Sequence, residues 1–333
     1  MKLRAIELSD LPALKALCEQ VSGELEFEPA QAEQRLQHSP GVNSALGIFD
    51  GDSLVAAAGM GALDRPRVRH VGKLWLAATA ADTAQVRPLI EALRGLAFDW
   101  WHLDRLELSL PSSSAHHDAL RGLMDRELTR KRDWHDGKAI VDSFVYGLLR
   151  PGLSAKSVTR EHARGPKGPM PASLELREVR VADAAGYVKV LSDPGVLWAT
   201  LQSPFTPASN WEKRIAANDP TRNHSCAAFV DGECVGTFGL HGSPSPRRQH
   251  VWMLGMGIAS AWQSRGLGRV LMDALMKHAQ ERGIARVELD VFADNHRAVA
   301  LYEKYGFAHE GRKRLDTWRE GAYTDGLEMA RLF

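Results

Sequence analysis

Cysteine is scarce in this chain, with only Cys18, Cys226 and Cys234 in 333 residues. That number excludes a disulfide scaffold of the kind that holds small secreted domains together. If Asp231-Gly232 closes a two-residue hairpin, Cys234 faces Phe229 across it. A disulfide between Cys226 and Cys234 is then not expected, and we predict buried, reduced thiols.

Long apolar runs and an excess of charge of one sign are also lacking. Hydrophobic residues make up 44% of the chain, yet no run approaches the length that crosses a bilayer. The start, Met1-Lys-Leu-Arg4, leads to Asp10 without the apolar segment of a secretory signal. A formal net charge of +1 gives no ground for nucleic-acid binding. We expect a cytoplasmic protein that engages neither membranes nor nucleic acids.

Histidines in a convincing metal-ligand spacing are lacking as well. The chain has 13 histidines, and the adjacent pair His116-His117 is interpreted as solvated. No metal is therefore expected in the site.

The length of the chain favours two domains. A stretch rich in Pro and Gly, with basic residues and little apolar content, runs from Pro151 through Pro171. That composition is typical of a linker. We expect a domain over residues 1–150, a linker over 151–173 and a second domain over 174–333.

The two halves repeat one another. Three segments of the first half have counterparts in the second: a strand running into a helix cap, a hairpin turn and a strand. They are 4–10 and 177–183, 48–52 and 229–233, 105–109 and 286–290. The economical interpretation is two tandem copies of one fold.

A glycine-rich turn stands near the end of the chain. Gln263-Ser-Arg-Gly-Leu-Gly-Arg269 comes after an apolar strand, Val251 to Ile258, and begins an amphipathic helix. The first N–H groups of a helix lack intrahelical partners, so Gly266 and Gly268 allow a phosphate to approach them closely. The turn lacks the ending of a P-loop and the first glycine of the dinucleotide fingerprint. By itself it fits a phosphate site and a plain helix start equally well.

The elements on the C-terminal side of the turn decide between these two interpretations. The helix ends at Arg282-Gly283, and an alternating strand runs from Ala285 to Phe292. A second helix then carries Asn295 and Tyr302. This βαβα order predicts a right-handed crossover between neighbouring strands.

Together these features resemble the GCN5-related N-acetyltransferase (GNAT) superfamily. The resemblance is carried by Gln263-x-x-Gly266-x-Gly268 and by the segment 295–307, and it covers about residues 174 to 333. Thr200-Leu-Gln202, the segment 247–251 and Gly321-x-Tyr323-x-Asp325 are similar to a bacterial branch that acetylates free L-amino acids. The implied fold is α/β, with two tandem GNAT-like domains, each a mixed, mostly antiparallel sheet flanked by helices.

The resemblance also implies a site for acetyl-CoA as acyl donor. The strand end would hold the thioester and the pantetheine arm, and the turn would hold the pyrophosphate. The residues implied are Met256, Gly257, Ile258, Gln263, Ser264, Arg265, Gly266, Leu267, Gly268, Arg269 and Asn295. Strand packing, solvated arginines and a simple helix cap at Asn295 are the alternatives.

Two catalytic roles are implied by the same resemblance. Tyr302 is implied as the general acid, with a core tyrosine as the alternative. The strand at 250–256 carries no carboxylate, so Asp290 on the next strand is our candidate base. His241, His250 and a water chain stay open for that role.

The acceptor site is expected in the segment Leu197–Phe205, which mixes apolar, aromatic and polar residues. A proline-broken loop packed on the core is the alternative. Tyr323 is a candidate for closing the pocket, and Arg247 or Arg248 for binding a carboxylate.

The function implied is transfer of acetyl to a primary amine of a small molecule by direct attack. A free amino acid is the first candidate for that small molecule. Within the enzyme class, a protein N-terminus, a polyamine or an antibiotic stays open as acceptor. A CoA-binding sensor or scaffold without turnover is the alternative from another class.

The first half is expected to have lost its cofactor site. Ala81–Val86, followed by Arg87, contains no glycine, and Arg121 stands near the place of Tyr302. We therefore interpret the domain 1–150 as a non-catalytic lid or a stand-in for a dimer partner. The chain would be a monomer with pseudo-dimeric domains or a homodimer, with one cofactor site in each chain.

Overall fold

A computed structural model describes residues 1–36, 43–63, 65–156 and 168–333. The chain divides into two compact units. The first comprises Met1–Val158, Pro244–Arg248 and Glu310–Leu327, and the second comprises Thr159–Ser243, Gln249–His309 and Glu328–Phe333. The domain limits 150 and 174 stay a prediction. Residues 157–167 of the expected linker lie outside the described residues.

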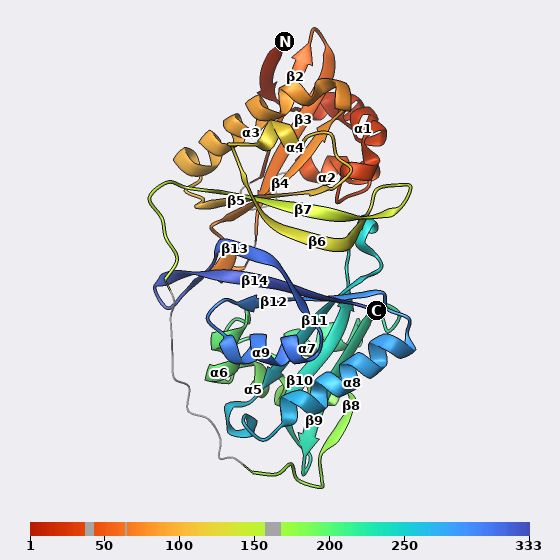
Figure 1. Ribbon diagram of the computed structural model, residues 1–333, viewed down its shortest axis with the longest axis vertical. Helices are drawn as coiled ribbons and strands as arrows, with labels where there is room; N and C mark the ends of the chain where they lie inside the picture. Colours follow the sequence, from red (N-terminus) through yellow and green to blue (C-terminus); the bar gives the residue numbers. More distant parts are fainter. Residues whose placement is uncertain (37–42, 64, 157–167) are drawn as a thin grey trace. The chain divides into compact units, whose positions relative to one another are not determined.

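The first unit is built on a mixed sheet (Figure 1). Its strand order is β1-β2-β3-β4-β5-β7-β6-β13. The strands are β1 (Lys2–Ala5), β2 (Asn43–Asp50), β3 (Ser53–Ala62), β4 (Val71–Ala78), β5 (Arg105–Pro111), β6 (Asp125–His135), β7 (Ile140–Leu149) and β13 (Ala308–Arg319). The pair β4–β5 is parallel, and the other registered pairs are antiparallel. The helices are α1 (Leu11–Gln20), α2 (Ala32–Leu36), α3 (Val86–Gly95) and α4 (His117–Leu120).

The second unit has the same construction. Its strand order is β14-β12-β11-β10-β9-β8, with β11–β12 parallel and the registered pairs from β11 to β8 antiparallel. The strands are β8 (Glu175–Glu178), β9 (Asn223–Val230), β10 (Glu233–Gly242), β11 (Val251–Ile258), β12 (Arg286–Phe292) and β14 (Ala322–Leu332). The helices are α5 (Ala184–Leu191), α6 (Pro194–Ala199), α7 (Ala208–Ala216), α8 (Leu267–Glu281) and α9 (His296–Lys304). Strands β13 and β14 contribute residues to both units.

The order of elements repeats from one half of the chain to the other. Strands β1 to β5 and β8 to β12 occur in the same succession, each with its one parallel pair at the end. The hairpin that comes next is also inserted in the same way, because β7 lies next to β5 as β14 lies next to β12. The prediction of two tandem domains with mixed, mostly antiparallel sheets is thus confirmed.

The repeat extends to a half-buried side-chain motif at the start of each half. In both, an arginine of the first strand makes a two-pronged ion pair with an aspartate six residues later, at 2.6 and 2.8 Å for Arg4–Asp10 and at 2.7 and 2.9 Å for Arg177–Asp183. The hydrogen bonds from Arg4 lower the pKa of Asp10 to about 2. Each aspartate also accepts from a backbone N–H three residues before it, which fixes the turn into the helix.

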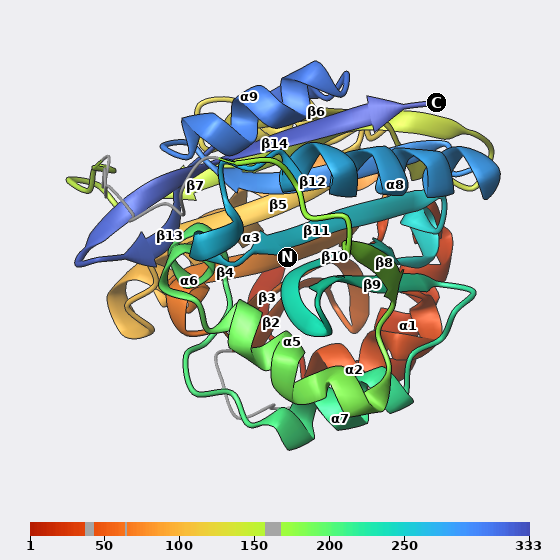
Figure 2. The ribbon, with the colours of Figure 1, turned by 90° about the horizontal axis from the view of Figure 1, so that it is seen from below.

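Alternation along the strands places helices on both faces of each sheet. In the first unit Leu46 and Ile48 pack with α3, whereas Ala45 and Ala57 pack with α1 and α2. In the second unit α5 and α6 pack against Ala227 and its neighbours. Helices α8 and α9 lie on the opposite side of that sheet from α5 and α7 (Figure 2).

The cysteine prediction is confirmed. Cys234 pairs with Phe229 in the β9–β10 register, and Cys18, Cys226 and Cys234 are all free and buried. In the part of the chain that the structure describes, no helix has the length and apolar character needed to cross a lipid bilayer.

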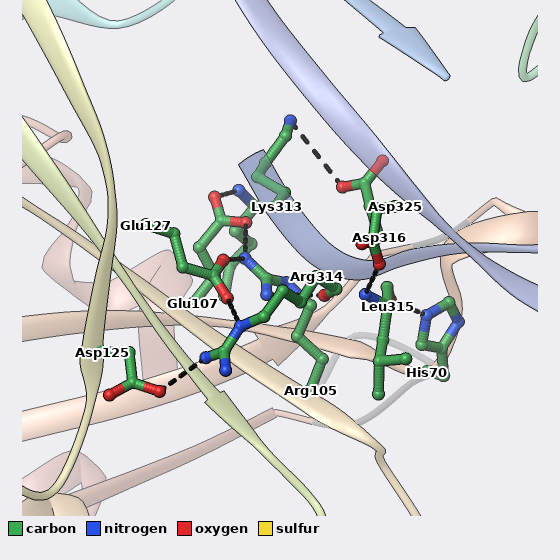
Figure 3. A network of polar contacts seen from close by, with 11 residues as sticks. His70, Arg105, Glu107, Asp125, Glu127, Lys313, Arg314, Leu315, Asp316 and Asp325 are labelled. Atoms are coloured by element: carbon green, nitrogen blue, oxygen red, sulfur yellow. Dashed lines mark hydrogen bonds and ion pairs between the residues drawn. The ribbon is translucent and has the colours of Figure 1, made fainter. Parts of the chain in front are cut away.

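A network of buried charges lies in the first unit (Figure 3). Arg105 on β5 bonds Glu107 at 3.1 Å, Glu127 on β6 at 2.7 Å and the Arg314 carbonyl on β13 at 2.8 Å. Burial alone would raise the pKa of Glu107, but the charges of Lys73 and Arg105 outweigh it and hold that pKa well below its usual range. The network therefore ties β13 to the first repeat.

Candidate functional site

The parallel strands β11 and β12 separate part of the way along. They pair at Val251–Arg286, Trp252–Val287 and Met253–Glu288, where the described register ends. Strand β11 nevertheless continues to Ile258 and β12 to Phe292. Backbone groups at the end of β11 are therefore left without a strand partner on the β12 side. This exposed strand end contains Met256, Gly257 and Ile258.

Helix α6 packs directly against this strand end. A Cβ placed on Gly257 would lie 3.0 Å from Val196. Asp193, the N-cap of α6, accepts from Gly195 N at 2.9 Å and from both Ser260 N and Oγ at 3.0 and 2.6 Å. Sequence reasoning missed Asp193, although an Asp before Pro194 is a recognisable helix start. It fixes α6 beside the turn that comes after β11.

The glycine-rich turn leads into α8 with unusual backbone angles. Ser264 has φ 66° and Gly266 has φ 90°, so both are left-handed. Gly266 is the N-cap of α8, which has no side-chain cap among the described residues. The first backbone bond of the helix runs from Arg269 N to Gly266 O at 3.0 Å. The N–H groups of Leu267 and Gly268 precede that bond and point out of the helix end.

The turn leaves its backbone open to a bulky anion. A Cβ on Gly266 would meet nothing within 4 Å, and one on Gly268 would touch only Leu301 at 3.3 Å and Ile258 at 3.6 Å. Free helical donors with an unobstructed approach fit a phosphate group. Of the two arginines, Arg265 stacks over Trp262 at 4.9 Å and Arg269 is exposed.

Gln263 joins the turn to two other elements. Its side chain donates from Nε2 to the Ile258 carbonyl at 3.0 Å and accepts at Oε1 from Arg297 at 3.4 Å. Arg297 is the second residue of α9. Sequence reasoning missed this arginine, because only the fold brings the start of α9 beside the turn.

Asn295 is the N-cap of α9. Its side chain accepts from Ala298 N at 3.3 Å, as a helix cap does. A cofactor contact by this residue stays a prediction.

Tyr302 lies on α9 with 8% of its surface exposed. Burial raises its pKa to about 12, so the phenol keeps its proton at any working pH. Its ring packs near Phe307, and burial is the cause of its raised pKa. A neutral phenol is a competent proton donor.

The candidate bases differ in exposure. Asp290 is exposed on β12, two residues beyond the buried Glu288, which pairs with Arg286 at 3.0 Å. Asp290 comes after the last β11–β12 pair, which accounts for the change from buried to exposed on the same strand face. His241 is half-buried beside Asn223, and burial lowers its pKa.

The expected acceptor residues fall into both units. Trp198 is buried at the end of α6, Thr200 Oγ1 donates to Val196 O at 2.8 Å, and Phe205 is 95% exposed. Two other candidates belong to the first unit and are engaged there. Arg248 binds the buried Asp133 at 2.8 Å, and Tyr323 donates to Asp104.

The start of α3 and the end of β4 in the first repeat are occupied by side chains, whereas the equivalent start of α8 in the second repeat is open. We call the first repeat closed and the second open. Gln85, the N-cap of α3, has an ordinary φ of −84°, and Arg87 occupies the second helical position that Gly268 holds in α8. His116 is only 1% exposed and bonds the Ala78 carbonyl at the end of β4 at 2.9 Å. The prediction of a solvated His116-His117 pair is wrong, because this imidazole caps the strand end.

A stacked histidine pair holds the other end of α8. The rings of His278 on α8 and His224 on β9 lie 3.5 Å apart and nearly parallel. Glu178 lies 3.7 Å from His224, the Cys226 thiol 3.2 Å from it, and Arg282 comes next after α8. Burial lowers the pKa of both histidines. The charge of Glu178 opposes this shift in part, and the charge of Arg282 adds to it.

This pair predicts loss of stability in acid. Because both pKa values are lower in the folded protein, the unfolded chain binds more protons below its own value of 6.5. Stability is then fully present above that pH and falls below it, by at most about 1.4 kcal/mol per pH unit for each histidine. Urea unfolding from pH 8 to 5 measures it, and His278→Phe should flatten the slope. An equal slope in both proteins would contradict the assignment.

Comparisons with known proteins identify the chains to which this one is similar. The acetyltransferase (GNAT) family model matches residues 195–307. The L-amino acid N-acetyltransferase AaaT of Escherichia coli is 32% identical over 160 residues, which are 48% of this chain and 98% of that protein. The [ribosomal protein bS18]-alanine N-acetyltransferase of E. coli is 32% identical over 130 residues, 38% of this chain and 76% of that protein. A solved GNAT-family acetyltransferase of Streptococcus pneumoniae is 27% identical with a TM-score of 0.44, covering 48% of this chain and 99% of that one.

The fold is duplicated in one chain, and the second copy combines a split parallel strand pair with an open helix start. The chain belongs to the GNAT family of N-acetyltransferases.

Proposed function

We propose that the second unit transfers acetyl from acetyl-CoA to the primary amine of a small molecule, with free L-amino acids as the first class. The observation that carries the proposal is the end of the β11–β12 pairing beside the left-handed N-cap of α8. The similar E. coli proteins support an amine acceptor, since one is named for L-amino acids and the other for a protein alanine.

The residues of the turn and of the strand end would hold the donor. Backbone N–H groups from Ser264 to Gly268 would bind the pyrophosphate, since that of Arg269 already donates to the Gly266 carbonyl, and Asn295 would add a contact from α9. The edge of Met256–Ile258 that faces away from β10, beyond the last registered pair with β12, would bind the pantetheine arm and the acetyl carbonyl. Bound acetyl-CoA supplies an acetyl group activated as a thioester.

The chain's own side chains would move the protons. Tyr302 would give its hydroxyl proton to the departing sulfur, and Asp290 would take a proton from the attacking amine. His241, His250 and water stay alternatives for the second role. Burial raises the pKa of Cys226 to about 12 and that of Cys234 to about 11, so neither thiol is a ready nucleophile. Direct attack by the amine is therefore preferred over an acyl-enzyme.

The first repeat would be a non-catalytic scaffold. Arg87 stands where the second repeat has Gly268, and His116 occupies the strand end that would otherwise meet a cofactor. We therefore expect one acetyl-CoA for each chain.

A thiol-release assay over a panel of amines tests the function. Acetyl-CoA and the full chain are incubated with free amino acids, polyamines, aminoglycosides and peptides with a free N-terminus. Amine-dependent release of thiol, largest for one or more amino acids, is the expected result. Thiol release with peptides or polyamines alone would show that these, and not free amino acids, are the acceptors. Cofactor binding with no release for any amine would favour a sensor.

A substitution at the start of α8 should weaken the binding of acetyl-CoA. Gly266→Ala places a Cβ in the open space beside the free N–H groups and strains a left-handed residue. We expect acetyl-CoA affinity to fall about tenfold, the equivalent of about 1.4 kcal/mol. Titration calorimetry measures both the affinity and the stoichiometry of one per chain.

Gly283→Ala is the matched control at the other end of the same helix. Gly283 also has positive φ, at 63°, and open space around its Cβ direction. Both variants should lose similar folding stability, but only Gly266→Ala should lose affinity. Equal acetyl-CoA affinities in the two variants would show that the turn is not part of the cofactor site.

A further inference from the structure

Gln263 sits at the meeting point of four elements in the second unit. Its amide nitrogen donates to the Ile258 carbonyl of β11, and its amide oxygen accepts from Arg297 of α9. A Cβ on Gly195 at the start of α6 would lie 3.4 Å from the same nitrogen. The residue itself begins the turn that leads into α8. Its side chain therefore relates all four elements to one another.

The chemistry of the two partners determines which way the carboxamide faces. A guanidinium has only donors, so Arg297 can bond only the oxygen of the amide. A backbone carbonyl has only lone pairs, so Ile258 can bond only the NH₂ group. The two contacts thus select a single orientation of Gln263. Without Arg297, only the bond to the Ile258 carbonyl would orient the carboxamide.

In the first repeat a different residue caps the carbonyl at the equivalent strand end. Its strand-end carbonyl, Ala78 O, accepts from His116 at 2.9 Å. His116 and Arg297 each stand eleven residues after the buried arginine that begins the preceding strand, Arg105 or Arg286. In the closed repeat this position caps the strand end directly, and in the open repeat it acts through Gln263. His116 is buried in this position of the closed repeat, whereas Arg297 is exposed in the open one.

We propose that Arg297 is a positioning residue, which holds Gln263 on the Ile258 carbonyl and thereby shapes the turn that binds acetyl-CoA. The inference rests on the proposed function, since it concerns the same turn. Arg297 acts on the geometry of the N–H groups before α8. It sets cofactor affinity and leaves proton transfer at Tyr302 unaffected.

A double-mutant cycle in the full chain tests the proposal. Acetyl-CoA affinity is measured by calorimetry for wild type, Arg297→Ala, Gln263→Ala and the double variant, with kcat and KM from thiol release. We expect Arg297→Ala to weaken binding and raise KM about fivefold, with kcat unchanged, and Arg297→Lys to restore most of the loss. In the Gln263→Ala background, Arg297→Ala should add little, since the two residues act through one contact.

The control is His296→Ala, which removes the exposed neighbour on the same first turn of α9 and should leave affinity unchanged. An Arg297→Ala protein that binds like His296→Ala would overturn the proposal. So would an undiminished loss in the Gln263→Ala background, since that result means a direct charge contact, with the strong salt dependence of an exposed ion pair. Wild type that binds no acetyl-CoA at all would instead contradict the proposed function, before any variant is compared.

Discussion

Replacing Tyr302 with phenylalanine is expected to lower kcat about 100-fold, within the range that a positioned proton donor contributes. The substitution keeps the ring that packs near Phe307, so folding and acetyl-CoA affinity should be nearly unchanged. A loss in kcat with little change in affinity identifies a group that acts in the transition state. Steady-state kinetics with the best amine of the panel, together with calorimetry, measure both quantities.

Tyr305→Phe is the matched control. Tyr305 comes directly after α9 and its pKa is also raised to about 12, first by burial and then by Asp273. Its hydroxyl, however, already donates to Asp273 at 2.7 Å and lies 2.9 Å from the Arg269 carbonyl. Removing it should change kcat by less than about twofold. An unchanged kcat in Tyr302→Phe would assign that residue to the core instead.

The second large effect is on stability, at the buried charge network of Figure 3. Arg105 is fully buried, and Glu127 is buried beside it. Replacing Arg105 with methionine leaves these carboxylates without their shared partner. Breaking a buried ion pair costs about 3 to 5 kcal/mol, so we expect the free energy of unfolding to fall by about that amount. Urea unfolding followed by fluorescence measures it.

An exposed arginine in the same unit supplies the comparison. Arg121 pairs with Asp118 at 2.7 Å, but both side chains are 83% exposed. Arg121→Met should change stability by less than about 1 kcal/mol. Arg105→Met with Glu127→Gln should recover part of the loss, because the uncompensated charge is removed as well. If Arg105→Met cost no more than Arg121→Met, the network would contribute little to stability.

The network also explains why most of the hairpin β13–β14 belongs to the first unit. Arg314 on β13 bonds Glu127 at 2.7 Å and Asp125 at 2.8 Å. His70 bonds the Leu315 carbonyl at 2.7 Å. Residues 310–327 therefore find their polar partners in the first repeat, although they come after the second repeat in the chain. This result supports a scaffold role for the first repeat.

Much of the local structure could be predicted from the sequence. The strand Val251–Ile258 and the end of α8 at Arg282-Gly283 lie where the pattern indicated. The tandem repeat and the Cys234–Phe229 pairing were also correct. These features depend on residues close together in the chain, where side-chain period and the special conformations of glycine leave few choices.

The partners of individual polar side chains could not be predicted in the same way. His116 looked like a solvated residue, and Arg248 and Tyr323 looked like candidates for an acceptor site. Arg297 and Asp193 carried no signal that set them apart from ordinary helix-start residues. Each of these contacts joins residues whose proximity depends on how helices and strands pack.

The family, the duplicated fold and the turn that suits a phosphate were all predictable from the sequence, because they depend on spacing and local backbone preference. The tertiary structure was needed to show how the two equivalent strand ends are capped, by His116 in the first repeat and by Gln263 in the second. It also decided that the last hairpin joins the first repeat. A buried charge needs a counter-charge nearby, and that partner can come from any segment that the fold brings close. The separation of the two residues along the chain does not predict it.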